Sequence, residues 1–549
     1  MNVKWFNTKI VFIAIVIVSF LLRFYLLGVN PPSLDWDEAS IGYNAYSILH
    51  TGKDEYGTSF PLSFRSFDDY KPPVYIYLTV PSVAVFGLTE FAVRFPAAAI
   101  GVLAVIVVYF FTKEILAGFP KKQREAISLL ACFFLAISPW HLQFSRAAFE
   151  GNIGMLFLIL SLWLFLKALK KPIFYIPYSV FFVLSIYSYH SFRMLDPILL
   201  VAMILLFYKQ LLKQKLMFIV SMVVIILLSL PIYMSFLNSQ DTGARLSMVT
   251  IFSDPALLKQ SADKLVIAKN SHNVIDEVLY NRRVIFVPTM IRGYFDHFRF
   301  DFLFLRGDGG VQHHAYNMGM LYLWDFPFIL LGIFSLIKKT NRRVLLLIIL
   351  FILGPLPSSI TSGTPQPIRA IAMIPAFQIF SAIGLFSLFK MFAKEKATAM
   401  VVTSGAAILL LINFGYYLHS YYVVTPIKYG YFWQYGNKQV IAYARENETK
   451  YSRIIMSYQY DQPYIYYLFY NKIDPSWYQK NWNYSKTGVV DRFYRKIGKY
   501  EFRNINYQKD LAIKKALLLG TPKEIQIENS IGQIYFPDGT VAYRISETH

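Results

Sequence analysis

The chain has 549 residues; 55% are hydrophobic and 16% are charged, whereas a soluble globular protein carries about 25% charged residues. Its formal net charge is +21, but the Lys and Arg residues lie mostly in short loops between hydrophobic runs, which argues against nucleic acid as a partner. Cys132 is the only cysteine, so intramolecular disulfides and a thiolate metal cluster are excluded. These features predict a polytopic α-helical membrane protein.

Several hydrophobic runs approach the roughly 20 residues that span a bilayer. No small-residue cleavage site follows the first run, so we expect a retained helix there rather than a removed signal peptide. The sequence predicts about 11 membrane-spanning helices, at 10–27, 92–112, 126–140, 153–169, 174–189, 195–208, 216–236, 318–337, 344–360, 368–389 and 398–419.

Basic clusters between these runs set the expected orientation. They alternate with loops that are poorer in Lys and Arg, and the positive-inside rule places them in the cytoplasm together with the N-terminus. The basic set is Lys4 and Lys9; Lys113, Lys121, Lys122 and Arg124; Lys167, Lys170 and Lys171; Lys209, Lys213 and Lys215; Lys338, Lys339, Arg342 and Arg343; and Lys390, Lys394 and Lys396.

Residues 74–87, VYIYLTVPSVAVFG, form a shorter apolar run with Pro81 in its middle. A run of this length is more often interfacial or re-entrant than spanning. If it did span, the basic loop at 113–124 would fall outside the cell. We therefore predict a juxtamembrane segment within the first external loop.

This topology leaves four regions outside the cytoplasm: 28–91, 141–152, 237–317 and the tail 420–549. The predicted domains are a transmembrane module, 1–419, and a small extracytoplasmic α/β domain, 420–549. In the tail, RIIMS at 453–457 and ALLL at 516–519 are typical of strands, and 531–546 is typical of a hairpin with Asp538–Gly539 at its turn.

The first external loop carries the densest set of reactive side chains. Asp35, Asp37 and Glu38 follow the first helix, and Asp69-Tyr70-Lys71-Pro72-Pro73 comes later in the same loop. Proline fixes its own φ and restrains the residue before it, so we expect Lys71 to be held in one direction. A lysine at the membrane surface suits a lipid phosphate; ordinary solvated loop charges are the alternative interpretation.

Three further polar sets lie at external helix ends. Arg146 and Glu150 would stand one turn apart if 145–150 were helical. His190, Arg193 and Asp196 lie in YSYHSFRMLDP at 187–197, and Arg369 lies in TPQPIRA. Each set taken alone also fits a helix-end ion pair or an interface anchor.

Several motifs occur in the order seen in a known superfamily. DWDEASIGYNAYSIL, DDYKPPVYIYL, FAVRFPAA and SPWHLQFSRAAFEGN resemble GT-C glycosyltransferases, above all bacterial relatives of the protein O-mannosyltransferases and aminoarabinose transferases (glycosyltransferase family 39). The resemblance covers about residues 10–210 well. It is weaker later, although 299–310 and 319–332 also look like bacterial members.

The resemblance implies a GT-C fold and transfer of a hexosyl or pentosyl group from a polyprenyl-phosphate carrier to an extracytoplasmic protein, lipid or glycan. It implies a multi-pass plasma or inner membrane protein of cell-envelope glycosylation, with its active site and C-terminus outside. The family's first-loop acidic motif falls on Asp37 and Glu38, and its Lys-Pro-Pro motif begins at Lys71. Its second acidic site would fall on Glu150, where the family usually has Asp.

The reaction needs a carboxylate to take the acceptor's proton and cations to stabilise the departing phosphate. Asp37 is the candidate base, and Glu38 and Glu150 are the candidate orienting carboxylates. Attack opposite the phosphate would invert the anomeric centre. The candidate donor-binding residues are Asp69, Tyr70, Lys71, Arg146, His190, Arg193 and Arg369.

Two other classes of function stay open at this level. A transporter or flippase of lipid-linked glycans should place charges near the bilayer midplane, where these runs have few. A polymerase or ligase would differ mainly in the size of its donor. No cofactor is indicated; a divalent metal ion is left open, with His313 and His314 expected to be isolated surface histidines.

Overall fold

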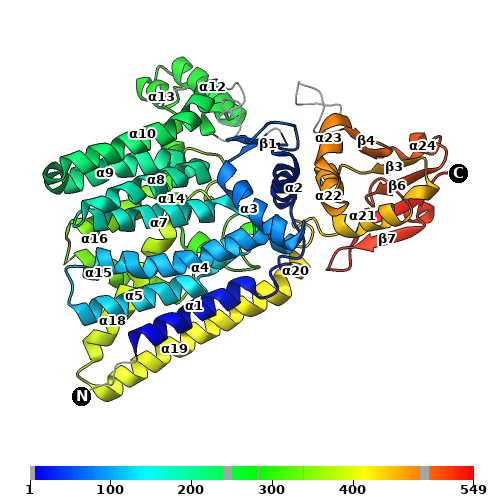
Figure 1. Ribbon diagram of the computed structural model, residues 1–549. Helices are drawn as coiled ribbons and strands as arrows, with labels where there is room; N and C mark the ends of the chain where they lie inside the picture. Colours follow the sequence, from blue (N-terminus) through cyan, green and yellow to red (C-terminus); the bar gives the residue numbers. More distant parts are fainter. Residues whose placement is uncertain (1–6, 68, 239–249, 282–283, 338, 482–493) are drawn as a thin grey trace. The chain divides into compact units, whose positions relative to one another are not determined.

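The computed structural model describes residues 7–67, 69–238, 250–281, 284–337, 339–481 and 494–549 (Figure 1). The chain divides into two compact units. We call Met1–Arg23, Ala99–Ser145 and Phe149–Tyr417 the helical unit, and Phe24–Ala98, Arg146–Ala148 and Leu418–His549 the loop–tail unit. The compact units therefore group the predicted first external loop with the tail, and not with the rest of 1–419.

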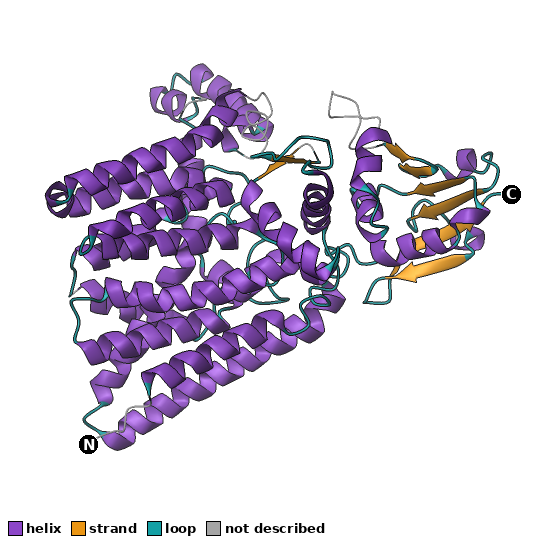
Figure 2. Ribbon diagram, viewed as in Figure 1, coloured by secondary structure: helices purple, strands orange, loops and turns teal. Residues whose placement is uncertain are grey.

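A helix lies at each of the predicted hydrophobic runs (Figure 2). Within the described residues, seven helices are long and apolar enough to cross a membrane; one of these spans, Arg342–Ser359, consists of α16 and the short helix that follows it. The four other helices at predicted runs, α1, α5, α8 and α15, have 17, 17, 14 and 13 residues. The bounds are α1 Thr8–Phe24, α4 Glu90–Ile115, α5 Lys121–Ile137, α7 Glu150–Ala168, α8 Tyr175–Ser188, α9 His190–Lys213, α10 Lys215–Asn238, α15 Asp325–Ile337, α16 Arg342–Leu353, α18 Ile374–Phe392 and α19 Lys396–His419.

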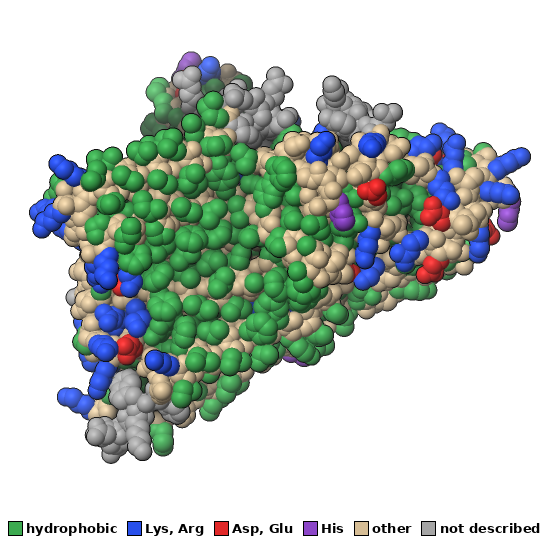
Figure 3. All heavy atoms as spheres, viewed as in Figure 1, with side chains coloured by type: hydrophobic (Ala, Val, Ile, Leu, Met, Phe, Trp, Pro, Cys, Tyr) green, Lys and Arg blue, Asp and Glu red, His purple; other side chains and the backbone are tan. Residues whose placement is uncertain are grey.

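Small residues allow two of these helices to approach closely. A Cβ atom added to Gly332 of α15 would lie 2.0 Å from the carbonyl oxygen of Phe380, and one added to Gly384 of α18 would lie 1.9 Å from that of Phe328. Backbone contact through small residues is typical of helices packed within membranes. In the helical unit, Lys and Arg side chains gather at one end of the helices, whose flanks are hydrophobic (Figure 3).

The predicted loop 237–317 contains further helices in its described part. These are η2 Ile251–Ser253, α12 Pro255–Asn270, α13 Val274–Leu279, α14 Phe286–Asp296, the π-helix η3 Asp301–Leu305 and η4 Val311–His313. Asp254 caps α12 by accepting hydrogen bonds from the amides of Ala256 and Leu257, as expected for an aspartate at that position. The described part of this region, from residue 250 onward, is thus largely helical rather than irregular.

The first loop of the loop–tail unit is also folded. It contains α2 Trp36–Thr51, the hairpin of β1 Phe64–Ser66 and β2 Asp69–Lys71, and α3 Pro73–Phe86. Helix α3 corresponds to the short apolar run at 74–87. Its 14 residues extend about 21 Å, which is less than the roughly 30 Å hydrocarbon core of a bilayer.

The tail builds a six-stranded mixed sheet in the order β4-β5-β3-β6-β8-β7. The strands predicted at 453–457 and 516–519 are confirmed as β3 and β6, which pair in parallel. The hairpin is confirmed as β7 and β8, with Gly539 at φ +84° in its turn. The strands are β3 Arg453–Met456, β4 Arg495–Ile497, β5 Tyr500–Phe502, β6 Ala516–Gly520, β7 Gly532–Tyr535 and β8 Val541–Glu547; the helices include α21 Asn437–Glu446, α22 Pro463–Tyr470 and α23 Pro475–Asn481.

Helix α2 packs against α22 and α23 of the tail. The approach is tight, because a Cβ atom on Gly42 would lie 2.5 Å from the Phe469 ring and 2.6 Å from a methyl group of Val93. The acidic helix of the first loop is therefore fixed by residues more than 400 positions further along the chain.

A buried polar cluster joins the end of this loop to the tail. Glu55 exchanges two hydrogen bonds with Asn44: its amide donates to Oδ1 at 3.0 Å, and its carboxylate accepts from Nδ2 at 3.3 Å. The Arg495 guanidinium lies 3.4 Å from the ring centroid of Tyr464 and donates to the hydroxyl of Tyr56 at 3.3 Å. Desolvation raises the pKa of Glu55 to about 7, although Arg495 and Asn44 oppose the shift.

The loop–tail unit should consequently lose stability as the pH rises. The folded state holds the Glu55 proton more tightly than the unfolded state, so this stabilisation is present at about pH 4.5 and lost on passing about pH 7. In Glu55→Gln, measured in detergent, the thermal unfolding midpoint should no longer fall between about pH 4.5 and about pH 7 because of this group. Glu528→Gln, at an exposed position, should keep the wild-type slope. An unchanged slope in Glu55→Gln would contradict the assignment.

Candidate active site

The acidic stretch of the first loop begins helix α2. Asp35 is the N-cap residue, and its side chain accepts a hydrogen bond from the Glu38 amide at 2.8 Å. Asp37 and Glu38 lie in the first turn, where negative charge is favoured by the helix dipole. The local sequence therefore explains why three carboxylates cluster here even without a ligand. Any difference in their roles must come from their different surroundings.

Glu38 is enclosed in a buried ion pair with Arg94 of α4. Arg94 Nε donates to Glu38 Oε1 at 2.9 Å, and Nη2 donates to Oε2 at 2.7 Å, which is a bidentate geometry. The Ala148 amide donates to the same Oε1 at 2.9 Å. Both Glu38 oxygens thus accept hydrogen bonds within the protein, and the side chain is 3% exposed.

Arg94 also organises the backbone that leads into α2. Its Nη1 donates to the carbonyls of Leu27 at 3.3 Å and Pro31 at 2.8 Å, and its Nη2 donates to that of Ser33 at 2.5 Å. One fully buried guanidinium therefore joins the turn before α2, the first turn of α2 and helix α4. Sequence reasoning gave Arg94 no role, although it lies in the FAVRFPAA motif.

Asp37 has a different environment. Its side chain is 51% exposed, and its Oδ1 accepts a hydrogen bond from Lys71 Nζ at 2.7 Å. The lysine itself is 8% exposed, held at the end of β2 and followed by Pro72 at φ −60° and ψ 145°. The directed lysine that Lys-Pro-Pro predicted is present, and its ammonium points to the one first-turn carboxylate that reaches solvent.

Asp35 completes the division of the three carboxylates. Burial raises the pKa of Asp35 well above its usual range, and the nearby charges of Glu38 and Asp37 raise it further. Asp35 therefore tends toward the neutral form, and it caps the helix. Asp37 remains as the accessible carboxylate of the group.

The hairpin residues before Lys71 support its position. Asp69 pairs with Ser66 across the hairpin, and Tyr70 pairs with Arg65. The Asp69 carboxylate accepts a hydrogen bond from the Tyr70 amide at 2.7 Å. Ser66 Oγ lies 2.9 Å from Ser40 Oγ, which ties the hairpin to α2.

Arg146 belongs to the loop–tail unit and is buried. Its Nη2 donates to the carbonyls of Tyr25 at 2.7 Å and Asn30 at 3.0 Å, and its Nε donates to the hydroxyl of Tyr421 at 3.0 Å. Residues 145–150 do not form the helix that would place Arg146 one turn from Glu150, because α6 Pro139–Phe144 ends before them and α7 begins at Glu150. The helix over 145–150, on which the expected i,i+4 spacing depended, is therefore not formed.

The remaining candidates lie in the helical unit. Glu150 and His190 are the first residues of α7 and α9, and Arg193 lies one turn further along α9. Arg369 precedes η5 Ile371–Met373, and its Nη1 donates to Thr361 Oγ1 at 2.6 Å. Asp37, Glu38, Asp69, Tyr70, Lys71 and Arg146 instead belong to the loop–tail unit.

A glutamine of the tail also reaches the acidic helix. Gln434 Oε1 accepts hydrogen bonds from the Trp36 amide at 2.9 Å and from the Tyr466 hydroxyl, while its Nε2 donates to the Tyr460 carbonyl at 2.7 Å. The tail thus caps a free amide at the N-terminus of α2. Nothing in the sequence near residue 434 signals this contact.

The histidine pair is not a pair of isolated surface residues. His314 is buried, and His313 Nδ1 lies 2.8 Å from Asp308 Oδ2. In the described parts of the chain, no three His, Cys, Asp or Glu side chains are arranged to hold a metal ion. These residues do not fit a metal centre as they stand, so no step below is assigned to one.

The chain resembles known proteins in sequence and in structure. Residues 70–234 match the family model described as dolichyl-phosphate-mannose-protein mannosyltransferase. No curated protein matches the chain. The matched segment includes Lys71, Arg94 and Arg146 but not Asp37 and Glu38.

Solved structures share the fold over most of the chain. ArnT from Cupriavidus metallidurans bound to undecaprenyl phosphate has a TM-score of 0.53 at 12% identity, covering 99% of this chain and 98% of that one. AglB from Archaeoglobus fulgidus, in complex with an inhibitory peptide and a dolichol-phosphate, has a TM-score of 0.51 at 14% identity, covering 86% and 64%. The A. fulgidus oligosaccharyltransferase in complex with Zn and sulfate has a TM-score of 0.52 at 17% identity. The match covers 87% of this chain and 58% of that one.

The chain is therefore a polytopic helical membrane protein with the GT-C fold, which confirms the predicted fold class. It spans about three fifths of the length of the oligosaccharyltransferase chains that it matches and nearly all of ArnT.

Breaking the Glu38–Arg94 pair should destabilise the protein strongly. Arg94→Met leaves a buried carboxylate without its guanidinium, which costs about 3–5 kcal/mol, whereas replacing both partners with apolar residues is often close to neutral. We expect Arg94→Met to lower the thermal unfolding midpoint. The double variant Arg94→Met/Glu38→Leu should recover most of the loss. A double variant less stable than Arg94→Met would contradict a structural role for the pair.

Proposed function

We propose that this protein is a glycosyltransferase that moves a sugar from a polyprenyl-phosphate carrier to an extracytoplasmic acceptor, with inversion of the anomeric centre. The observation that carries the proposal is the Asp37–Lys71 pair. It places an accessible carboxylate 2.7 Å from a largely buried ammonium at the N-terminus of α2. A base and an anion-binding cation are the two groups that such a transfer requires.

The similar proteins support the choice of donor. ArnT and AglB, which share the fold, were each solved with a polyprenyl phosphate, and the matching family model describes a transferase that uses dolichyl-phosphate-mannose. A phosphate on a lipid anchor also explains a cation close to the predicted membrane surface. We propose the plasma or inner membrane as the location, with the N-terminus in the cytoplasm and Asp37 outside.

The proposed sugar transfer needs no reagent besides the donor and the acceptor. Asp37 takes a proton from the acceptor's nucleophilic group as that group attacks the anomeric carbon. The bond between this carbon and the phosphate oxygen breaks, and polyprenyl phosphate departs carrying the bonding electron pair. Lys71 offsets the charge that develops on the phosphate. Because the phosphate is already a good leaving group, no general acid is required.

The other candidates receive supporting roles in this proposal. Glu38 holds the first turn of α2 through Arg94, so it orients Asp37 rather than touching the reacting atoms. Glu150 is the proposed second carboxylate for the sugar or the acceptor. Asp69 and Tyr70 support Lys71. Proposed further donor contacts come from Arg146, His190, Arg193 and Arg369. The proposed transferred group is a hexosyl or pentosyl group.

Asp37→Asn should reduce transfer by at least about 10²-fold, because the amide retains the shape of the side chain but cannot accept the proton. The assay is release of radiolabelled sugar from a panel of short-chain polyprenyl-phosphate sugars to a membrane extract, using purified protein. Glu90→Gln is a matched control, because it removes another carboxylate–lysine pair of the same unit, Glu90–Lys438 at 2.6 Å. Wild-type turnover by Asp37→Asn would exclude Asp37 as the base.

Lys71→Gln should weaken both donor binding and turnover, because the phosphate loses its cation in the ground state and in the transition state. The measurement is KM for the donor together with kcat. An unchanged KM and kcat would leave Lys71 with a structural role only. Tight binding of a lipid-linked oligosaccharide by the wild type, without transfer from any donor, would favour a flippase or ligase instead.

A further inference from the structure

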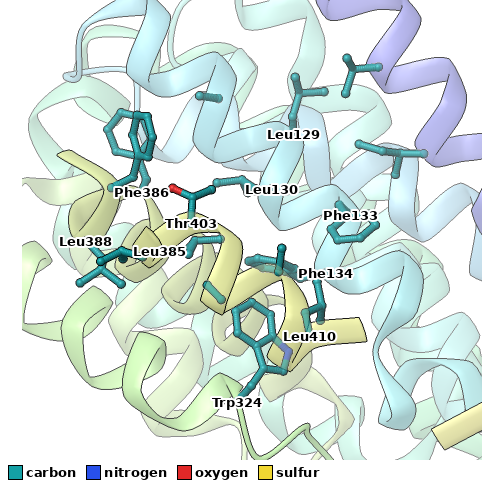
Figure 4. Close-up of a pocket in the computed structure, with 17 residues that line it drawn as sticks. Leu129, Leu130, Phe133, Phe134, Trp324, Leu385, Phe386, Leu388, Thr403 and Leu410 are labelled. Atoms are coloured by element: carbon teal, nitrogen blue, oxygen red, sulfur yellow. The ribbon is translucent and has the colours of Figure 1, made fainter. Parts of the chain in front are cut away.

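An apolar groove lies in the helical unit, among residues other than those of the candidate active site. This groove, of about 580 Å³, runs between four helices, α1, α5, α18 and α19, and Trp324 also lines it (Figure 4). Its lining is almost entirely hydrocarbon; the hydroxyl of Thr403 is already satisfied by the Ala399 carbonyl at 2.7 Å. The groove therefore suits an alkyl chain.

The lining residues come from single faces of their helices. Helix α5 contributes positions 126, 129, 130, 133 and 134, and α19 contributes 402, 403, 406, 407 and 410. Both sets follow the three- and four-residue spacing of one helical face. The α19 face carries Ala406 and Ala407, whose small side chains leave the space open. This hydrophobic span of α19 has none of its residues buried, so the protein alone covers little of that helix.

A second cavity, of about 250 Å³, shares Phe386 of α18 with this groove; we call it the polar cavity, because five of its ten lining residues are polar, although the other five are apolar. Helix α18 also presents Ser387 and Lys390 to it, while Ser335 and Lys339 come from α15 and the segment after it. Ser335 donates to Ser387 Oγ at 3.1 Å. Gln123 of α5 completes the polar lining, which contains no acidic residue.

The two lysines are exposed and available to an anion. Lys339 Nζ lies 5.5 Å above the Phe119 ring, and Lys390 lies in the last turn of α18. Both belong to basic clusters that the positive-inside rule assigns to the cytoplasm. Basic pockets between membrane helices on that side are suited to anionic lipid head groups.

We propose that the polar cavity and the groove together bind one anionic phospholipid. Its phosphate lies between Lys339 and Lys390, and an acyl chain fills the groove between α5, α18 and α19. The lipid thereby supplies packing to α19 that the protein does not provide. The proposal does not depend on the proposed transfer reaction, whose Asp37–Lys71 pair belongs to the other compact unit.

Native mass spectrometry of the purified protein in detergent tests the head-group site. We expect wild type to bind phosphatidylglycerol about twenty-five-fold more tightly than phosphatidylcholine, since each of the two lysines near the anion contributes on the order of a fivefold gain. The variant Lys339→Gln/Lys390→Gln should lose this preference. Lys209→Gln/Lys213→Gln, which removes two lysines of the same predicted side from α9, should keep it. Equal binding of both lipids by wild type would overturn the proposal.

Filling the groove tests the acyl-chain site separately. Ala407→Trp should weaken binding of phosphatidylglycerol and phosphatidylcholine alike, whereas Gly405→Ala, where an added Cβ meets no atom within 4 Å, should leave both unchanged. Unchanged lipid binding in Ala407→Trp would overturn the acyl-chain assignment. Displacement of phosphatidylglycerol by a sugar-free polyprenyl phosphate at equal concentration would also overturn the proposal, because it would assign the groove to the carrier lipid.

Discussion

The buried ion pair between Glu38 and Arg94 is the interaction on which the candidate site depends. A paired charge in a low-dielectric interior is tolerated only when its remaining hydrogen-bonding groups are also satisfied. Here the guanidinium is surrounded by the two Glu38 oxygens and three carbonyls, and Glu38 also accepts from the Ala148 amide. Segments that begin near residues 27, 36, 90 and 146 are therefore fixed to one another at a single point.

This fixed point gives adjacent acidic residues different chemistry. Glu38 satisfies a buried cation, Asp35 is desolvated and caps the helix, and Asp37 turns outward to Lys71. A carboxylate that is both accessible and held in place is suited to take a proton from an incoming group. Since Asp37 and Glu38 are neighbours on one helical turn, any movement of Glu38 would also move the proposed base.

Patterns that are local in sequence predicted structure well. Hydrophobic runs identified helices throughout the helical unit, and Asp538–Gly539 identified the hairpin between β7 and β8. The Pro-Pro pair after Lys71 correctly indicated a directed lysine. In each case the signal and the structure involve the same few residues, so little depends on the rest of the chain.

Such local patterns did not predict the contacts between residues that lie far apart in the sequence. Arg94 received no role from the sequence, because its partner lies 56 positions earlier. The sequence predicted a donor contact for Arg146 but did not indicate its hydrogen bonds to two distant segments. His314 looked exposed because it lies in a polar stretch, yet it is buried. Each of these residues is polar, and its burial is decided by tertiary packing rather than by its neighbours in the sequence.

Contacts from the tail hold the acidic helix α2 in place. Gln434 bonds the amide at the start of α2, α22 and α23 pack along that helix, and the Glu55–Arg495 cluster closes its far end. The tail therefore fixes both ends of the helix that carries Asp37. A module that only recruited an acceptor would need no such contacts. Positioning the helix that carries Asp37 and recognising an acceptor are separate tasks, and these contacts perform the first.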